Sequence, residues 1–160
     1  MEGVERKAIC VCATEPGQTA YGVVYFTQAS ADSKVNIKGT FKGLSPGKHG
    51  FHIHQFGNLS EGCKTAGPHY NPHGKTHGGP TDEERHVGDM GNVEAVEDGT
   101  ATFELDDHLI SLFGEFSVLG RAVVLHADED DLGKGGVELS KTTGNAGARI
   151  ACGVIGTMMP

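Results

Sequence analysis

Apolar and polar side chains alternate with a period of two residues over most of this chain, and this alternation constrains its fold more than any other feature. Val35, Ile37 and Phe41 would share one side of an extended segment, with Asn36 and Lys38 on the other. Strict alternation indicates half-buried β-strands, and no stretch shows the sustained apolar period of an amphipathic helix. The predicted strands cover residues 6–13, 23–28, 35–41, 48–56, 92–97, 101–106, 117–126 and 149–156.

Turn signals separate these predicted strands, as in Ser45-Pro46-Gly47 and Glu97-Asp98-Gly99. About eight short strands joined by such turns predict an all-β protein, built as a sandwich or a barrel. The chain has 160 residues, which suits a single domain spanning residues 1–160 that is large enough to bury a core.

The charge balance of the chain restricts its function. It carries 21 acidic and 13 basic residues, and its net charge is −8. A general nucleic-acid-binding protein would carry a basic surface, so this class is disfavoured. A small anionic substrate is still compatible with the sequence, because a local cationic site can exist within an acidic field.

The N-terminal segment and the cysteines bear on the compartment. Residues 1–7 are charged and lack the apolar run of a signal peptide, and no segment has the length and hydrophobicity of a membrane span. These features predict a cytoplasmic protein, unless a leader preceded this sequence. A reducing cytosol disfavours disulfides, so composition alone favours free thiols for Cys10, Cys12, Cys63 and Cys152.

Two long segments break the alternation, at residues 57–91 and 128–148. The first is rich in glycine and contains four histidines, whereas the second is acidic and then rich in glycine. Loops longer than about 12–15 residues are uncommon in compact domains and are usually functional or disordered. The first segment is therefore predicted to be a loop that a bound metal ion orders.

Histidines on a predicted strand form the first candidate metal-binding group. In the segment Gly50–Phe56, Phe51 and Ile53 would face the core, and His52 and His54 would project together from the other face. Two imidazoles at this spacing can bind one metal ion. Taken alone, such a pair is more often an ordinary exposed pair of histidines.

A second candidate group lies in the first long loop. His69, His77, His86 and Asp89 provide three imidazoles and a carboxylate, which suit tetrahedral zinc. Each residue could also be a solvated loop side chain. His126 ends the apolar run 122–125 and is either a solvent-capped strand end or a further ligand that the sheet brings to the first pair. Several imidazoles with an open position suit copper.

Six motifs, in the right order, closely resemble those of the copper/zinc superoxide dismutase family, and the likeness extends from about residue 8 to 156. The motifs are Gly50-Phe51-His52-Ile53-His54-Gln55-Phe56-Gly57, Ala66-Gly67-Pro68-His69-Tyr70-Asn71-Pro72, His77-Gly78-Gly79-Pro80, Arg85-His86-Val87-Gly88-Asp89, Asp131-Leu132-Gly133-Lys134-Gly135-Gly136 and Gly144-Asn145-Ala146-Gly147-Ala148-Arg149.

The resemblance implies a fold, two metal ions and a disulfide. The fold would be an eight-stranded antiparallel Greek-key sandwich or flattened barrel with two long functional loops. The copper ligands would be His52, His54, His69 and His126, the zinc ligands His69, His77, His86 and Asp89, and Asp130 would hydrogen-bond His52 and His77. Cys63 and Cys152 would form a disulfide, against the expectation from composition, while Cys10 and Cys12 would stay reduced.

The implied activity is the disproportionation of superoxide to dioxygen and hydrogen peroxide by alternate reduction and reoxidation of copper, with zinc ordering the site. His69 would bridge the metals and take up a proton, and Arg149 would hold the anionic substrate. Lys134 and Lys141 would attract it, a form of electrostatic steering for which superoxide dismutases are a known example, and Thr143 would narrow the channel. A homodimer and loading by a copper chaperone are also implied.

Some residues depart from the family pattern. Val137 and Leu139 stand where polar and acidic residues are usual, so the field around this loop is expected to differ. Three other functions share parts of this pattern: a dismutase-like domain of a copper chaperone, a zinc hydrolase and a structural zinc sandwich. A chaperone domain would lack copper ligands, a hydrolase needs an open zinc position, and a structural zinc protein leaves His52, His54 and His126 unexplained.

Overall fold

The computed structural model describes residues 4–159; residues 1–3 and 160, which belong to the predicted domain and in part to the charged N-terminal segment, lie outside the described residues. Eight strands and two short 3-10 turns make up the regular structure of the described part. They are β1 (Arg6–Thr14), β2 (Tyr21–Gln28), β3 (Val35–Lys42), β4 (Gly47–His54), η1 (Cys63–Ala66), β5 (Asp89–Ala95), β6 (Ala101–Asp107), β7 (Ala122–His126), η2 (Glu138–Lys141) and β8 (Arg149–Met158).

The strands form one antiparallel sheet in the order β5-β4-β7-β8-β1-β2-β3-β6. The two terminal strands, β5 and β6, approach each other without pairing, so the sheet curls into a nearly closed barrel. This arrangement confirms the predicted all-β, Greek-key fold class. Within the described part of the chain, no helix has the length and apolar character needed to cross a membrane.

Most strand boundaries differ from the prediction by a few residues, and three of these differences concern the strands that carry histidines or their neighbours. β4 ends at His54, two residues early, because the N–H groups of Gln55 and Phe56 donate to loop carbonyls instead of a strand. β5 begins three residues early and so includes Asp89. The segment 117–121 is a turn, not the start of β7, and it contains Gly120 in the left-handed conformation with φ of 82°.

The inward side chains of the strands fill the barrel. Phe41 and Phe51 are buried in it, and partly buried Phe103 packs against them, with ring centroids 5.2–6.0 Å apart. Phe51 and Ile53 of β4 are fully buried in this core. Because side chains alternate along a strand, His52 and His54 must lie on the opposite, outer side of β4.

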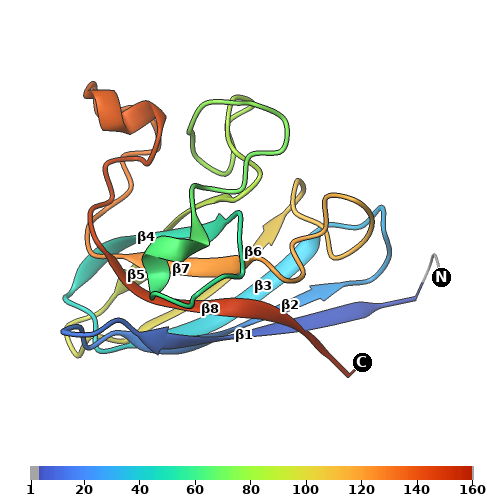
Figure 1. Ribbon diagram of the computed structural model, residues 1–160, viewed down its shortest axis with the longest axis horizontal. Coiled ribbons are helices and arrows are strands. Elements are labelled where there is room, and N and C mark those ends of the chain that lie inside the picture. Colours follow the sequence, from blue (N-terminus) through green and yellow to red (C-terminus); the bar gives the residue numbers. More distant parts are fainter. Residues whose placement is uncertain (1–3, 160) are drawn as a thin grey trace.

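Figure 1 shows the two long loops, drawn in green and orange, rising from the same side of the barrel. Residues 55–88 connect β4 to β5, and residues 127–148 connect β7 to β8. β4 and β7 are paired neighbours in the sheet, so both loops start from adjacent strands. The outer side of β4 is therefore covered by loops, and its histidines are buried on both sides.

A buried ion pair anchors the first loop to the barrel. The Arg85 guanidinium donates to the Asp107 carboxylate at 2.7 Å and to the carbonyls of Pro80, His86 and Val87. Asp107 also accepts the N–H groups of residues 109 and 110. The Arg85 guanidinium and the Asp107 carboxylate thus both have full sets of hydrogen-bond partners, which a buried charge requires.

Replacing Arg85 with Met is expected to lower the free energy of unfolding by about 3–5 kcal/mol, because Asp107 would remain buried without its counter-charge. Urea unfolding of the metal-free, disulfide-bonded protein measures this loss. The exposed pair Lys38–Glu104, at 3.7 Å, supplies the control, and Lys38→Met is expected to cost at most about 1 kcal/mol. Equal losses in the two variants would contradict the anchoring role of Arg85.

Candidate metal centre

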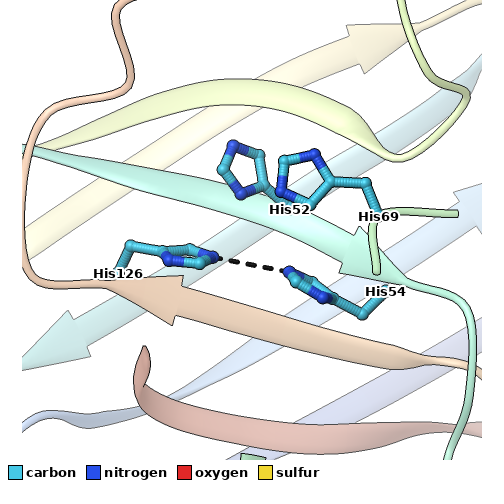
Figure 2. A group of neighbouring side chains, drawn as sticks. All are labelled: His52, His54, His69 and His126. Atoms are coloured by element: carbon cyan, nitrogen blue, oxygen red, sulfur yellow. Dashed lines mark hydrogen bonds between the residues drawn. The ribbon is translucent and has the colours of Figure 1, made fainter. Parts of the chain in front are cut away.

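Four histidines from three parts of the chain meet on the outer side of β4. His52 and His54 come from β4, His126 ends β7, and His69 comes from the first loop, as Figure 2 shows. The loop is brought to β4 by main-chain hydrogen bonds, in which Tyr70 donates to the Ile53 carbonyl. A bulge between residues 125 and 126 shifts the pairing register at His126.

The four imidazoles converge on one point. One ring nitrogen from each of His52, His54, His69 and His126 lies within 4.8 Å of the others. The Nε2 atoms of His54 and His126 are 3.4 Å apart, the contact marked in Figure 2. All four side chains are at least 95% buried. Four buried imidazoles around a common centre form a site for a nitrogen-preferring metal ion such as copper.

A second group also contains His69 and is formed by the first loop and the start of β5. It adds His77, His86 and Asp89, whose ligand atoms also lie within 4.8 Å of one another. Asp89 Oδ1 is 3.0–3.2 Å from the Nδ1 atoms of all three histidines. Asp89 Oδ2 accepts the main-chain N–H groups of Gly78 and His86, which fixes the orientation of the carboxylate. Three imidazoles and one carboxylate are a donor set for zinc.

Hydrogen bonds hold the outer ring nitrogens of His54 and His126, which directs their inner nitrogens toward the centre of the first group. His54 Nδ1 donates to the Gly67 carbonyl at 2.8 Å, and His126 Nδ1 donates to the Gly147 carbonyl at 3.1 Å. A histidine that donates from one nitrogen presents an unprotonated lone pair at the other, and metal-binding histidines are usually oriented in this way.

Asp130 connects the two groups. Its Oδ2 is 2.6 Å from His52 Nε2, and its Oδ1 is 2.7 Å from His77 Nε2. Asn92, which sequence reasoning missed, holds Asp130 through two main-chain hydrogen bonds of 2.7 and 3.0 Å. Gly144 was also missed; a Cβ there would collide with Asp130 Oδ1 and His77 Nε2. The only sequence feature that pointed to Gly144 was its place in the family motif Gly144–Arg149.

The donor atoms fit metal binding because several of them have no other partner. Among the described residues, four buried side-chain atoms lack a hydrogen bond, and three of these are His52 Nδ1, His69 Nε2 and His77 Nδ1. Leaving a buried polar atom without a partner costs about 1–3 kcal/mol. His77 Nδ1 is near Asp89 Oδ1 but is not aligned for a hydrogen bond, as expected when both atoms point at a shared ion.

The protonation of the first group also favours metal binding. Burial, followed by the neighbouring imidazoles, lowers the pKa of His52 and His54 well below the usual value. Burial lowers the pKa of His126 to about 4, and it lowers the pKa of His69 although Asp89 opposes the change. Neutral imidazoles at pH 7 have lone pairs ready for a metal ion.

The second group holds a proton when no metal is bound. Burial lowers the pKa of His77, but the hydrogen bond to Asp130 and the nearby Asp89 carboxylate outweigh it and raise the value to about 9. Burial would raise the pKa of Asp89, yet the neighbouring imidazoles of His69, His77 and His86 hold it far below its usual range. A proton on His77 therefore balances the carboxylates in the metal-free protein, and zinc binding would release it.

The metal-free protein is expected to lose on the order of 2 kcal/mol of stability between pH 6.5 and about pH 9. A pKa raised on folding gives stability that is complete below the unfolded value near 6.5 and is lost as pH rises through the folded value. The histidines with lowered pKa values add stability as pH rises to about 7.5, where the unfolded chain loses their protons, so the loss from His77 is measured above that pH. Urea unfolding from pH 6 to 10 measures the slope, and His77→Gln should abolish it; equal slopes in both proteins would contradict the assignment.

Arg149 begins β8 beside the first group. Its Nη1 donates to the Cys63 carbonyl at 2.9 Å, and partial burial lowers its pKa without removing its charge at pH 7.

Cys63 and Cys152 form a disulfide, as the resemblance predicted and against the expectation from composition. Cys10 and Cys12 are free and buried, also as predicted, with their Sγ atoms 3.7 Å apart.

The predicted steering residues are placed differently from one another. Lys134 Nζ pairs with Asp82 at 2.7 Å, so its charge is partly balanced. The side chains of Lys141 and Thr143 are exposed on the second loop, and the Lys141 carbonyl accepts the His77 N–H. The apolar residues Val137 and Leu139 are each about half exposed nearby, at 51% and 52%.

Comparison with known families agrees with this geometry. The family model for copper/zinc superoxide dismutase (SODC) matches residues 20–155 of the chain. That span contains both histidine groups, the disulfide and Arg149. A dismutase-like chaperone domain is not favoured, because a complete four-histidine group is present. The chain belongs to the copper/zinc superoxide dismutase family, whose members use copper and zinc to disproportionate superoxide into dioxygen and hydrogen peroxide.

Proposed function

We propose that His52, His54, His69 and His126 bind the copper ion of this superoxide dismutase, and that His69, His77, His86 and Asp89 bind its zinc ion. The observation that carries this assignment is the position of His69. Its Nε2 is buried without a hydrogen bond, and its Nδ1 faces Asp89 at 3.0 Å. Both nitrogens of one imidazole can therefore serve as ligands, one for each ion.

Copper, when bound, supplies the one-electron chemistry by its alternate reduction and reoxidation, while zinc has no redox chemistry and would order the loop. The protein residues do the rest. His69 Nε2 can hold a proton next to the substrate whenever that nitrogen is not bound to metal. Asp130 orients one ligand of each group, and these two hydrogen bonds fix the imidazole rings of His52 and His77 relative to each other.

Arg149 would bind the superoxide anion. Its guanidinium is half buried next to the first histidine group, and its charge lowers the pKa of His54 and His126. A fixed cation in a partly desolvated position attracts a small anion more strongly than a solvated one. Lys141 and Thr143 would form the outer part of the approach, and Lys134 would contribute less because it is paired with Asp82.

The experiment that tests the proposed function combines metal analysis with a rate. The protein should bind one copper and one zinc ion per chain and consume superoxide only when copper is present. Zinc binding without any superoxide consumption after copper loading would contradict the assignment.

We further propose a homodimer that forms through an exposed apolar patch, defined by Val11, Phe56 and Val154. Their side chains are 67%, 49% and 42% exposed, and they come from β1, the first loop and β8. Contiguous exposed apolar surface of this kind marks an interaction site. Val154→Asp is expected to convert a dimer into a monomer in light scattering, whereas the exposed β2 variant Tyr21→Asp should remain dimeric. A wild-type monomer would contradict the proposal.

Cytoplasmic localisation and loading by a copper chaperone are proposed from the family resemblance. Cell fractionation tests the first. Copper content of the protein from cells with and without such a chaperone tests the second, and equal copper in both would contradict it.

A further inference from the structure

Glu15, in the connection between β1 and β2, contacts the segment that carries the disulfide. Its carboxylate Oε1 accepts the Cys63 main-chain N–H at 2.8 Å. One carboxylate oxygen and the two disulfide sulfurs lie within 4.8 Å of one another. Neither the metal ligands nor the proposed substrate contacts account for this carboxylate.

The main chain of Glu15 is fixed to the other half of the disulfide. Its N–H donates to the Ile150 carbonyl of β8 at 3.0 Å, and the preceding residue pairs with Ala151. Cys152 is next to Ala151 on the same strand and pairs with Ala13. Glu15 therefore joins the segment of Cys63 to the strand of Cys152 by hydrogen bonds, in parallel with the covalent bond between them.

The backbone around Cys63 is shaped to admit the carboxylate. Gly62 has φ of +83°, and a Cβ on it would lie 2.6 Å from Glu15 Oε1. A side chain at this position would displace the carboxylate from the Cys63 N–H. The contact thus depends on a glycine in a conformation that other residues rarely adopt.

We propose that Glu15 is a positioning residue that keeps Cys63 next to Cys152 and so favours the disulfide over the dithiol. Two effects act in the same direction. The charge-assisted hydrogen bond holds the loop segment in place when the disulfide opens, which keeps the two thiols close. The negative charge also disfavours a thiolate beside it, and by repelling an anionic thiolate that attacks the disulfide it slows the opening without shifting the equilibrium.

The opening reaction defines where these effects act. A glutathione thiolate attacks one sulfur, forms a mixed disulfide with that cysteine and releases the other cysteine as a thiolate, which takes up a proton. A second glutathione thiolate attacks the mixed disulfide, leaves as oxidised glutathione and releases the first cysteine as a thiolate, which is protonated in turn. Two electrons pass from two glutathione molecules to the protein disulfide.

The contact between Glu15 and Cys63 also bears on Arg149, the residue proposed to bind the substrate. The Cys63 carbonyl accepts the Arg149 guanidinium, so a loop segment that Glu15 holds also holds the acceptor of Arg149. This arm of the proposal rests on the proposed function, since it assumes that Arg149 binds superoxide. The effect on the disulfide does not depend on that assumption.

The test is the equilibrium between disulfide and dithiol in glutathione buffers, measured on the metal-loaded protein. Acid quenching, unfolding and maleimide labelling distinguish the states, because Cys10 and Cys12 are labelled in both and Cys63 and Cys152 only after reduction. Glu15→Ala is expected to shift the equilibrium toward the dithiol by about 10-fold or more, and Glu15→Gln, which keeps an acceptor oxygen, by about threefold. The control is Glu61→Gln, because Glu61 is exposed and lies close to Cys63 on the first loop. This variant should shift the disulfide–dithiol equilibrium less than twofold.

The opening rate separates the two effects. Glu15→Gln should be opened about fivefold faster than wild type by glutathione, whose thiolate is anionic, but at nearly the wild-type rate by a neutral phosphine. If Glu15 only stabilised the fold, its substitution would destabilise the oxidised and reduced proteins equally and leave the disulfide–dithiol equilibrium unchanged. An unchanged equilibrium in Glu15→Ala, or an equal shift in Glu61→Gln, overturns the proposal, whatever the superoxide activity of these variants.

Discussion

His126→Ala is expected to lose copper and at least about 100-fold of the superoxide consumption while it keeps its zinc. His126 belongs only to the first histidine group, and its Nε2 points toward His54 Nε2 at 3.4 Å. Loss of a residue that merely orients a ligand typically costs 10–100-fold in metal affinity or activity, so loss of a ligand should cost more. The close contacts of His69, His77 and His86 with Asp89 do not involve His126 and should remain.

The matched control for this prediction is His86→Ala, which removes a residue only of the second group. It should lose zinc and keep the four histidines of the first group. Metal analysis after dialysis against a weak chelator measures both ions in both variants. Copper retained at wild-type occupancy in His126→Ala, or copper lost and zinc retained in His86→Ala, would contradict the assignment of the two groups.

Arg149→Glu is expected to lower kcat/KM for superoxide on the order of 100-fold with copper and zinc content unchanged. The substitution places a negative charge where the half-buried guanidinium would receive the anion. Charges that line an approach to a site can change association rates by about 10–1000-fold, an effect for which superoxide dismutases are a known example. Salt screens such effects, so the rate of the wild-type protein should fall with ionic strength and that of Arg149→Glu should rise.

Two further variants locate the effect of charge. Lys134→Glu reverses a charge that is already paired with Asp82, and it should change the rate far less than Arg149→Glu. Arg149→Lys keeps the charge but loses the planar guanidinium that contacts the Cys63 carbonyl, so an intermediate rate is expected. Equal rates for wild type and Arg149→Glu at low salt would contradict the role of Arg149.

The fold was largely predictable from local patterns. Alternation located strands such as 35–42 because inward Val35, Ile37 and Phe41 fill the barrel and their neighbours face solvent. It failed at 117–121, where Val118 is buried but belongs to a turn and donates to the Ser111 carbonyl. A buried apolar residue looks the same in a strand and in a turn, so only the long-range contact distinguishes them.

The metal groups were predictable in a different way. Spacing indicated candidate ligands, and the family motifs supplied the grouping that spacing left open. Alternation correctly placed His52 and His54 on the face opposite Phe51, but it could not show that the loops bury that face. Asn92 and Glu15 were missed because the side chain of each acts on the main chain of a distant residue, Asp130 or Cys63. No local pattern marks such residues.

The imidazole of His69 is expected to belong to both metal sites. Electron paramagnetic resonance of the protein loaded with Cu²⁺ in the first group and Co²⁺ in the second tests it most directly. A shared imidazole should couple the two ions magnetically and remove the ordinary copper signal, which should return when cobalt is replaced by zinc. A full-intensity, uncoupled copper signal in the protein that holds both Cu²⁺ and Co²⁺ would contradict the claim.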